Sequence, residues 1–248
     1  MPGAQKANTS PLRLTTHFAS ASLRLVTSND SSRSVPPEGP SASFYQIKIL
    51  LLGLEPEIWR RLIVPADATL GWLHAVLQVS MGWTNSHLHQ FRHNDQKISD
   101  LSSDFGRFED DPLPLDEHKI RLNEIPEFAD TLFYYEYDFG DSWEHLIILE
   151  QVAGSGQGVA QRAVCIGGER ACPPEDCGGV YGYEEFLQAI SDPKHPEHAE
   201  MLGWINRPFD PGYFSADACN RWLAKLRWPK VTENALRKVL MGRDGVKE

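Results

Sequence analysis

The sequence predicts a fold that combines β-strands with helices, in which the C-terminal third of the chain is helical. Apolar side chains recur at every second position in residues 45–51 and 58–65, which is the period of a strand with a buried face. In residues 70–81, and again after residue 183, they recur at i, i+3, i+4 and i+7, which is the period of an amphipathic helix. The change of period therefore places strands before and after one helix, and further helices at the end.

The first two strands precede a helix with clear ends. Residues 55–57, with a central proline, separate the strands and predict a tight turn. Thr69 or Asp67 can cap the N-terminus of the following helix, and Gly82 can end it. Residues 87–94, HLHQFRHN, then return to strand character.

Residues 100–117 form an acidic segment. They hold seven acidic side chains against the single cation Arg107, together with two prolines. Such a composition favours a solvated and mobile loop over a packed element.

Residues 131–152 predict a β-hairpin. Gly140-Asp141 fits the two-residue loop of a type II′ turn, with glycine where the backbone needs a positive φ. In this register Glu136 lies opposite His145, and Asp138 lies opposite Trp143. Both faces are largely apolar, so we expect the hairpin at the centre of a sheet that is covered on both sides.

Helical spacing recurs in three segments of the C-terminal third, at 183–190, 198–205 and 219–226. Ser215 and Thr232 are candidate N-caps of the last two helices. We therefore expect three regions in the chain: a flexible Ser/Thr/Pro-rich extension at 1–43, a folded domain at 44–228, and a C-terminal helix and tail at 229–248.

The composition restricts the classes of partner. A formal net charge of −10 disfavours direct DNA binding, because that affinity rests on Lys and Arg side chains that neutralise phosphates. No apolar run approaches the roughly 18 residues that span a bilayer, so we predict a soluble, cytoplasmic protein with no membrane partner. An organelle-targeting role for the Arg- and Ser-containing N-terminus is the alternative. In the cytoplasm the four cysteines are expected to be reduced.

Several longer motifs carry a family resemblance. The ordered set PEIWRRL, TLGWLHAVLQVSMGW, HLHQF, YYEYDFGDSWEH, CPPEDCGGVYGY and FDPGYF resembles the plasmid pRiA4b ORF-3-like family, from about Tyr45 to about Leu226. The resemblance implies an α+β domain with a curved mixed or antiparallel sheet and packed helices. Members are often labelled transposon-passenger or resolvase-like proteins, which implies an association with mobile elements but no established activity. The sequence shows no helix-turn-helix with a basic recognition face, and its charge does not fit recombination on DNA.

The histidine-rich strand offers candidate metal ligands. His87, His89 and His93 fall on one strand face with Phe91, because side chains two residues apart point the same way. His87 and His89, with His145 and either Glu136 or Asp138, would supply the nitrogen and oxygen ligands of a divalent metal. The alternative is structural: these histidines hydrogen-bond to neighbouring acids, with Glu136 and His145 as a cross-strand pair.

Three cysteines offer a second, structural metal site. Cys165, Cys172 and Cys177 would hold zinc as thiolates, but their spacing is not that of a zinc knuckle. The alternative is that they pack beneath the turn PPEDCGG.

Two functions follow from these candidates. The first is a binding or accessory protein, for which a basic or extended peptide is the candidate ligand. The second is a metal-dependent hydrolase, in which one of the acids Glu136, Asp138, Asp141 or Glu144 takes the proton from bound water. An enzyme requires the histidine strand to lie beside the 131–152 hairpin with side chains converging on a pocket, whereas a binding module requires an exposed groove.

Overall fold

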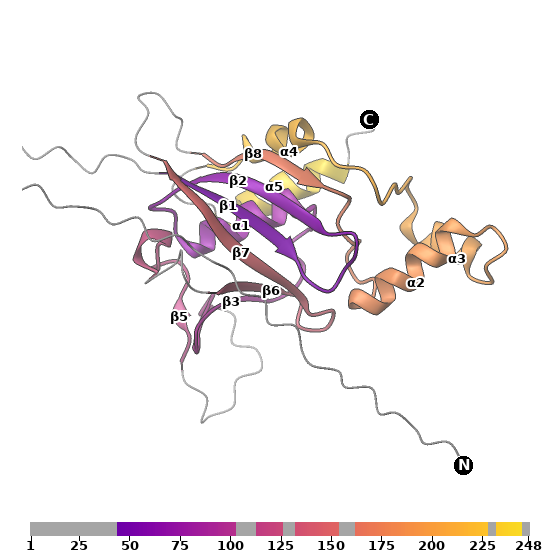
Figure 1. Cartoon of the computed structure of the whole chain (residues 1–248), viewed down its shortest axis with the longest axis horizontal. Coiled ribbons are helices and arrows are strands. Elements are labelled where there is room, and N and C mark those ends of the chain that lie inside the picture. The colour runs from indigo at the N-terminus through magenta and orange to yellow at the C-terminus, as the bar shows by residue number, and fades with distance from the viewer. Residues whose placement is uncertain (1–43, 103–112, 126–131, 154–161, 228–231, 245–248) are drawn as a thin grey trace, which may run out of the picture. The chain divides into compact units, whose positions relative to one another are not determined.

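The computed structural model describes residues 44–102, 113–125, 132–153, 162–227 and 232–244 (Figure 1). The predicted extension at 1–43 and the centre of the acidic segment lie outside the described residues. The division of the chain at residues 43 and 228 stays a prediction.

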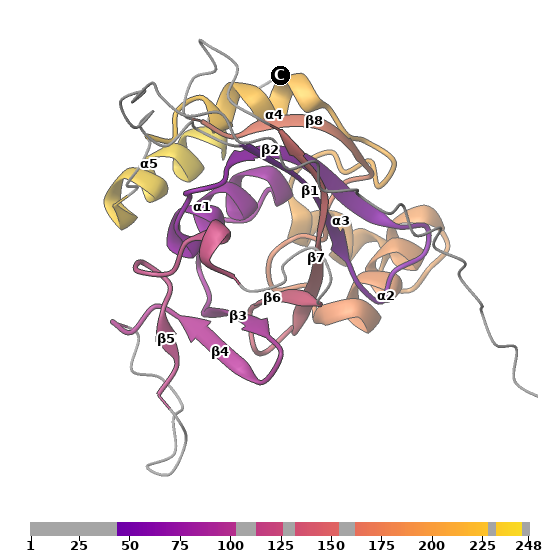
Figure 2. The same cartoon turned by 60° about the vertical axis from the view of Figure 1, so that its left-hand side comes forward.

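The core of the fold is one eight-stranded sheet with the order β5-β4-β3-β6-β7-β1-β2-β8. Neighbouring strands run antiparallel, except for the parallel pair β4–β5, so the predicted α+β class with a mixed sheet is confirmed. Figure 2 shows the sheet curving around the first helix, α1. The strands are β1 (Phe44–Leu51), β2 (Ile58–Pro65), β3 (His89–His93), β4 (Gln96–Ser99), β5 (Leu115–Asp116), β6 (Phe133–Tyr137), β7 (Trp143–Ala153) and β8 (Val164–Glu169).

Helix α1 (Leu70–Met81) has the ends that the sequence predicts. The Thr69 side chain accepts a hydrogen bond from the Trp72 backbone N–H, and Gly82 ends the helix in the left-handed conformation with φ 101°. Every residue of α1 except Gly71 is buried. The helix carries no charged residue, which is the pattern of a helix enclosed on all sides.

The predicted register of the hairpin is wrong by one residue. Tyr135 pairs with His145 and Glu136 with Glu144, so Glu136 and His145 are not opposite each other. The cause is Asp138, which adopts a φ of 58° and whose Oδ1 accepts a hydrogen bond from the Gly140 N–H at 2.9 Å. This interaction makes the loop longer than two residues, and a shift of one position turns every side chain to the other face.

The position of the hairpin is as predicted, but its environment is not. Strands β6 and β7 occupy the centre of the sheet. The face that carries Glu136 and Glu144 is only partly buried, and it holds polar pairs such as Gln90 with Glu136 and Arg92 with Glu144. The sheet is therefore covered fully on the side of α1 only.

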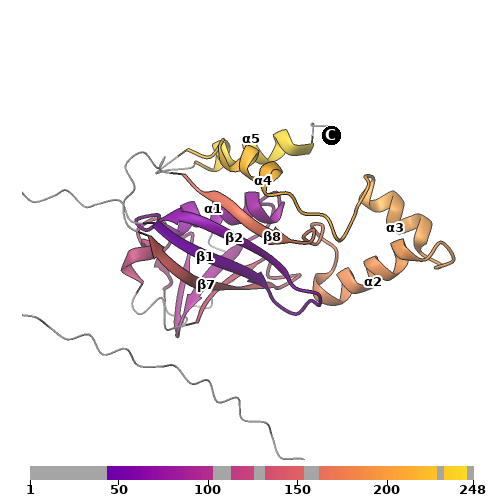
Figure 3. The same cartoon turned by 45° about the horizontal axis from the view of Figure 1, so that its top comes forward.

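The C-terminal third is helical, as expected. It contains α2 (Gly179–Ser191), α3 (His198–Ile205), α4 (Ala216–Leu223) and α5 (Glu233–Asp244). Earlier in the chain, a short 3₁₀ turn at Leu122–Glu124 precedes β6. Ser215 caps α4 by accepting from the Ala218 N–H, and Thr232 accepts from the Ala235 N–H. Helix α4 packs on β8 and α1, and α2 packs on α3 (Figure 3).

The acidic segment is not wholly a solvated loop. Its described end forms β5, which pairs with β4, and the next residue, Glu117, is only 1% exposed. The expectation of a solvated segment is therefore wrong for Glu117.

Within the described part of the chain, no helix has the length and apolar character needed to cross a membrane.

The cap of α1 gives a direct test of this fold. Replacing Thr69 with Ala removes the acceptor of the Trp72 N–H and should lower the free energy of unfolding by about 1 kcal/mol. Thr69→Ser keeps the hydroxyl and should stay close to the parent. Chemical denaturation of the three proteins measures the difference, and equal loss in both variants would show that the hydroxyl is not the stabilising group.

Candidate functional site

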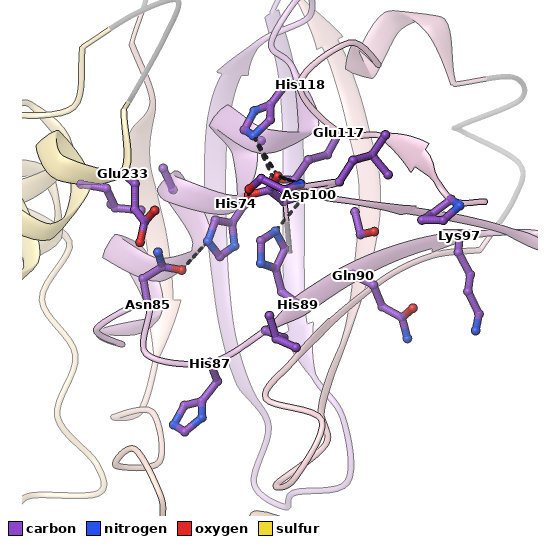
Figure 4. A pocket seen from close by; sticks show the side chains of 18 of the residues that line it. His74, Asn85, His87, His89, Gln90, Lys97, Asp100, Glu117, His118 and Glu233 are labelled. Atoms are coloured by element: carbon purple, nitrogen blue, oxygen red, sulfur yellow. Dashed lines mark hydrogen bonds and ion pairs between the residues drawn. The ribbon is translucent and has the colours of Figure 1, made fainter. Parts of the chain in front are cut away.

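A cavity of about 1180 Å³ opens beside α1. Its wall comes from α1, the loop at 85–88, strands β3 and β4, the segment around Glu117, and the first turn of α5 (Figure 4). The lining is rich in polar side chains, and several of them titrate. The cavity is therefore the place where the fold brings chemical groups from distant parts of the chain together.

A buried hydrogen-bond chain supports the floor of the cavity. Gln78 Nε2 donates to the Tyr135 hydroxyl at 3.0 Å, and this hydroxyl lies 2.9 Å from His74 Nδ1. The other ring nitrogen of His74 lies 2.7 Å from Asn85 Oδ1. With the Asn85 amide in this orientation, His74 Nε2 donates and His74 Nδ1 accepts, so the tautomer of the ring is fixed.

His89 and Glu117 form a pair on this floor, which we call the floor pair. His89 stacks on His74 with ring centroids 3.5 Å apart and an interplanar angle of 6°. Its Nε2 lies 2.8 Å from Glu117 Oε2. The two side chains are only 10% and 2% exposed.

Burial displaces the pKa of each group in this assembly. Desolvation lowers the pKa of His89 to about 3, and desolvation together with the charge of His89 lowers the pKa of His74 to about 3. Desolvation raises the pKa of Glu117 to about 7. Near neutral pH the two stacked imidazoles are therefore uncharged, and Glu117 is the group that exchanges a proton.

Backbone contacts hold Glu117 against the start of α1. Its N–H donates to Ser99 O at 3.1 Å, and its carbonyl accepts from the Gly71 N–H at 3.0 Å. A Cβ on Gly71 would lie 2.3 Å from His118 Nδ1 and 3.2 Å from Glu117 Oε1. Glycine at this position therefore lets the helix and the acidic segment approach closely.

His118 lies beside the floor pair, nearer to solvent. Its Nε2 is 4.0 Å from Glu117 Oε1 and 3.9 Å from Asp100 Oδ1, and its side chain is 56% exposed. When protonated, His118 favours the ionised form of Glu117.

A second group adjoins the cavity through His87, the member that lines it, and we call this group the rim cluster. His87 Nε2 is 3.5 Å from Asp138 Oδ2 and 3.0 Å from Asp176 Oδ1. Two of the predicted ligands, His87 and Asp138, are thus together, and Asp176 joins them from the segment before α2. His87 precedes β3 and points away from His89 (Figure 4).

The other predicted site residues are elsewhere. His145 is fully buried, with its Nδ1 3.2 Å from Tyr135 O and its ring against Trp83. Glu136 and Glu144 lie on the opposite face of the sheet, and Asp141 Oδ2 accepts from the Gly178 N–H at 3.1 Å. The described side chains therefore do not gather the predicted set around one ion.

The three cysteines also have separate environments. Cys165 lies beside Cys219, while Cys172 Sγ is 3.0 Å from Arg60 Nη2. Cys177 lies near the carboxylates of Asp141 and Asp176, and desolvation raises the pKa of its thiol to about 12. Among the described residues, the rim cluster is the one group of three or more whose donor atoms are close enough to share a metal, so the three thiols do not meet.

The sequence interpretation missed His74 and Glu117. A signal existed for His74: a helix without charged residues is buried on all sides, so its His and Gln side chains need partners inside the protein. No comparable local signal singles out Glu117 among the seven acids of its segment.

The site and the fold define a protein with a polar cavity beside an enclosed helix, and known proteins share this fold. The chain belongs to the plasmid pRiA4b ORF-3-like protein family, whose model matches residues 43–218. It is 39% identical over 164 residues to the uncharacterized protein y4hQ of Sinorhizobium fredii (strain NBRC 101917 / NGR234), a match that covers 66% of this chain and 81% of that protein.

A solved structure is also similar. The crystal structure of the protein of unknown function MM3350 from Methanosarcina mazei Go1 matches with a TM-score of 0.64 and 33% sequence identity, over 72% of this chain and 97% of that chain. The family resemblance and the fold expected from the sequence are thus confirmed, and neither relative is named for an activity.

The displaced pKa of Glu117 predicts a pH-dependent stability. The folded-state pKa of about 7 lies above the ordinary value of 4.5, so the stabilising effect of its proton is present below pH 4.5 and is lost as the pH rises through 7. Glu117→Gln cannot lose a proton. The free energy of unfolding of this variant, relative to the parent, should therefore rise by up to about 3 kcal/mol between pH 4.5 and 8.

Chemical denaturation at a series of pH values measures this difference. The histidines also change the free energy of unfolding with pH, but this effect largely cancels in the difference because the variant and the parent both contain them. Glu184→Gln, which changes an exposed carboxylate on α2 outside the lining of the cavity, is the matched control for the loss of one acidic side chain. A flat difference for Glu117→Gln would contradict the raised pKa.

Proposed function

We propose that this protein is an enzyme, a hydrolase, which binds a small polar molecule in the cavity and uses the floor pair to accept and return a proton. The observation that carries the proposal is the buried Glu117 carboxyl, 2.8 Å from His89 Nε2 at the floor of a large polar cavity. A buried titrating carboxyl in a cavity is typical of acid–base catalysis.

The division of roles within the site follows from the local electrostatics. Two protonated imidazoles stacked at 3.5 Å would repel each other, and the His74 ring is buried while the His89 side chain is only 10% exposed. A proton taken from water or from a substrate hydroxyl is therefore held by Glu117, while neutral His89 hydrogen-bonds to the carboxyl and orients it. A group with a pKa near 7 both accepts and returns a proton efficiently at neutral pH.

The arrangement of strands supports an enzyme over a binding module. The histidine strand β3 pairs directly with β6 of the hairpin, and His74 and His89 converge on the cavity. This proposal takes up the hydrolase, which was the alternative from the sequence, and Glu117 replaces the four acids Glu136, Asp138, Asp141 and Glu144 as the proton acceptor. A binding or accessory role, with or without mobile elements, was the first expectation from the sequence and becomes the second hypothesis, since the cavity would also hold a ligand that does not react.

A panel of chromogenic esters, amides and phosphate esters tests the proposal. We expect one class to be hydrolysed, with kcat/KM rising with pH through an apparent pKa near 7. Glu117→Gln should reduce kcat by roughly 10²- to 10⁴-fold, the usual range for loss of a general base. Glu184→Gln is the matched control and should keep the activity of the parent.

Two outcomes would contradict the proposal. One is hydrolysis that Glu117→Gln leaves unchanged. The other is a cavity that binds compounds from the panel, as seen by NMR, without turning any of them over, which would favour the binding role.

A further inference from the structure

We propose that His87, Asp138 and Asp176 form a binding site for a divalent transition-metal ion at the rim of the cavity. The three residues come from three segments: the loop before β3, the end of β6, and the turn before α2. Their donor atoms all lie within 4.8 Å of one another. The proposal does not rest on the proposed function, because none of these residues belongs to the floor pair.

The distances fit a shared ion. His87 Nε2 lies 3.0 Å from Asp176 Oδ1 and 3.5 Å from Asp138 Oδ2. Ligands that each lie about 2.1 Å from one metal are about 3.0–3.4 Å apart in octahedral or tetrahedral geometry. His87 Nε2 therefore already lies about as far from each of the two carboxylate oxygens as two ligands of one ion lie from each other.

The state of the His87 ring gives an independent reason to place a ligand here. Its Nε2 is shielded from solvent and makes no hydrogen bond with any described residue, although oxygens of two carboxylates lie 3.0 and 3.5 Å away. A shielded nitrogen without a hydrogen bond is costly, and a bound ion is one of the few explanations. A simple His–Asp hydrogen bond would have satisfied this atom.

Neighbouring groups orient the carboxylates toward this point. The Asp138 side chain is only 10% exposed, and its Oδ1 accepts from the Gly140 N–H at 2.9 Å, which leaves Oδ2 toward His87. Glu175 stands behind the cluster, with Oε2 3.8 Å from His87 Nε2. Its Oε1 accepts from the Thr84 N–H at 2.6 Å and from the Tyr137 hydroxyl at 3.0 Å. Such outer partners fix the ligands of metal sites.

The donor set and the exposure indicate the kind of ion. One imidazole and two carboxylates suit Zn²⁺ or Mn²⁺, and together they neutralise a divalent charge. The nearby thiol of Cys177 is not among the donor atoms that lie within 4.8 Å of one another, so the set consists of one nitrogen and two oxygen ligands. The Asp176 side chain is 68% exposed, which leaves coordination positions open to water or to a bound molecule.

Metal titration of the untagged full-length chain tests the inference. The protein is stripped with a chelator and dialysed, and Zn²⁺ and Mn²⁺ are then titrated separately by calorimetry, with elemental analysis for stoichiometry. We expect one ion per chain. Asp138→Asn and Asp176→Asn should each weaken binding by about 100-fold or more, since loss of an outer-shell partner alone costs roughly 10- to 100-fold.

Matched variants make the result decisive. Asp95→Asn removes an exposed carboxylate that lines the cavity outside the rim cluster, and it should leave the affinity unchanged. Asp176 is exposed, so its replacement by Asn should leave the melting temperature of the metal-free protein unchanged. A loss of metal binding in this variant is then the loss of a ligand and not of the fold. Glu117→Gln should bind metal like the parent, so a failed hydrolase assay and a failed metal site remain distinguishable.

Three results would overturn the inference: no binding of either ion tighter than millimolar, unchanged affinity in Asp138→Asn and Asp176→Asn, or equal weakening in Asp95→Asn.

Discussion

The enclosure of α1 is the constraint on which the rest of the structure depends. Eleven of its twelve residues are buried, so a polar side chain on this helix must find its partner inside the protein. Gln78 and His74 both meet the Tyr135 hydroxyl, and His74 also meets Asn85. The polar positions of one helix thereby fix an inner residue of the central strand β6 and the loop that leads into β3.

The same enclosure decides the electrostatics of Glu117. The carboxyl lies near the first turn of α1, where the helix dipole favours the ionised form by about 0.3–1 kcal/mol. Raising its pKa from 4.5 to about 7 requires an opposing effect of about 3 kcal/mol. Desolvation of the Glu117 carboxyl is therefore the larger effect. Glu117 retains its proton up to neutral pH because its carboxyl is buried, even though a helix N-terminus is close.

Local sequence signals sufficed for most of the fold. The strands β1 and β2 and the helix α1 with both caps follow from side-chain periodicity and from residues that act within one turn of the chain. The hairpin register was not predictable in this way, because the Asp138 side chain competes with the expected glycine turn for the backbone N–H groups. The site was harder still: Glu117 meets His89 across 28 residues, and no local pattern encodes that contact.

Two tyrosines on the inner face of β6 connect the floor pair and the rim cluster. Tyr135 supports His74 beneath the floor pair, and Tyr137 holds Glu175 behind the rim cluster. Alternate residues of a strand share a face and are about 7 Å apart, so one rigid strand sets the spacing of both groups. His87 and His89 can face different groups because His87 precedes β3, where strand alternation does not yet hold.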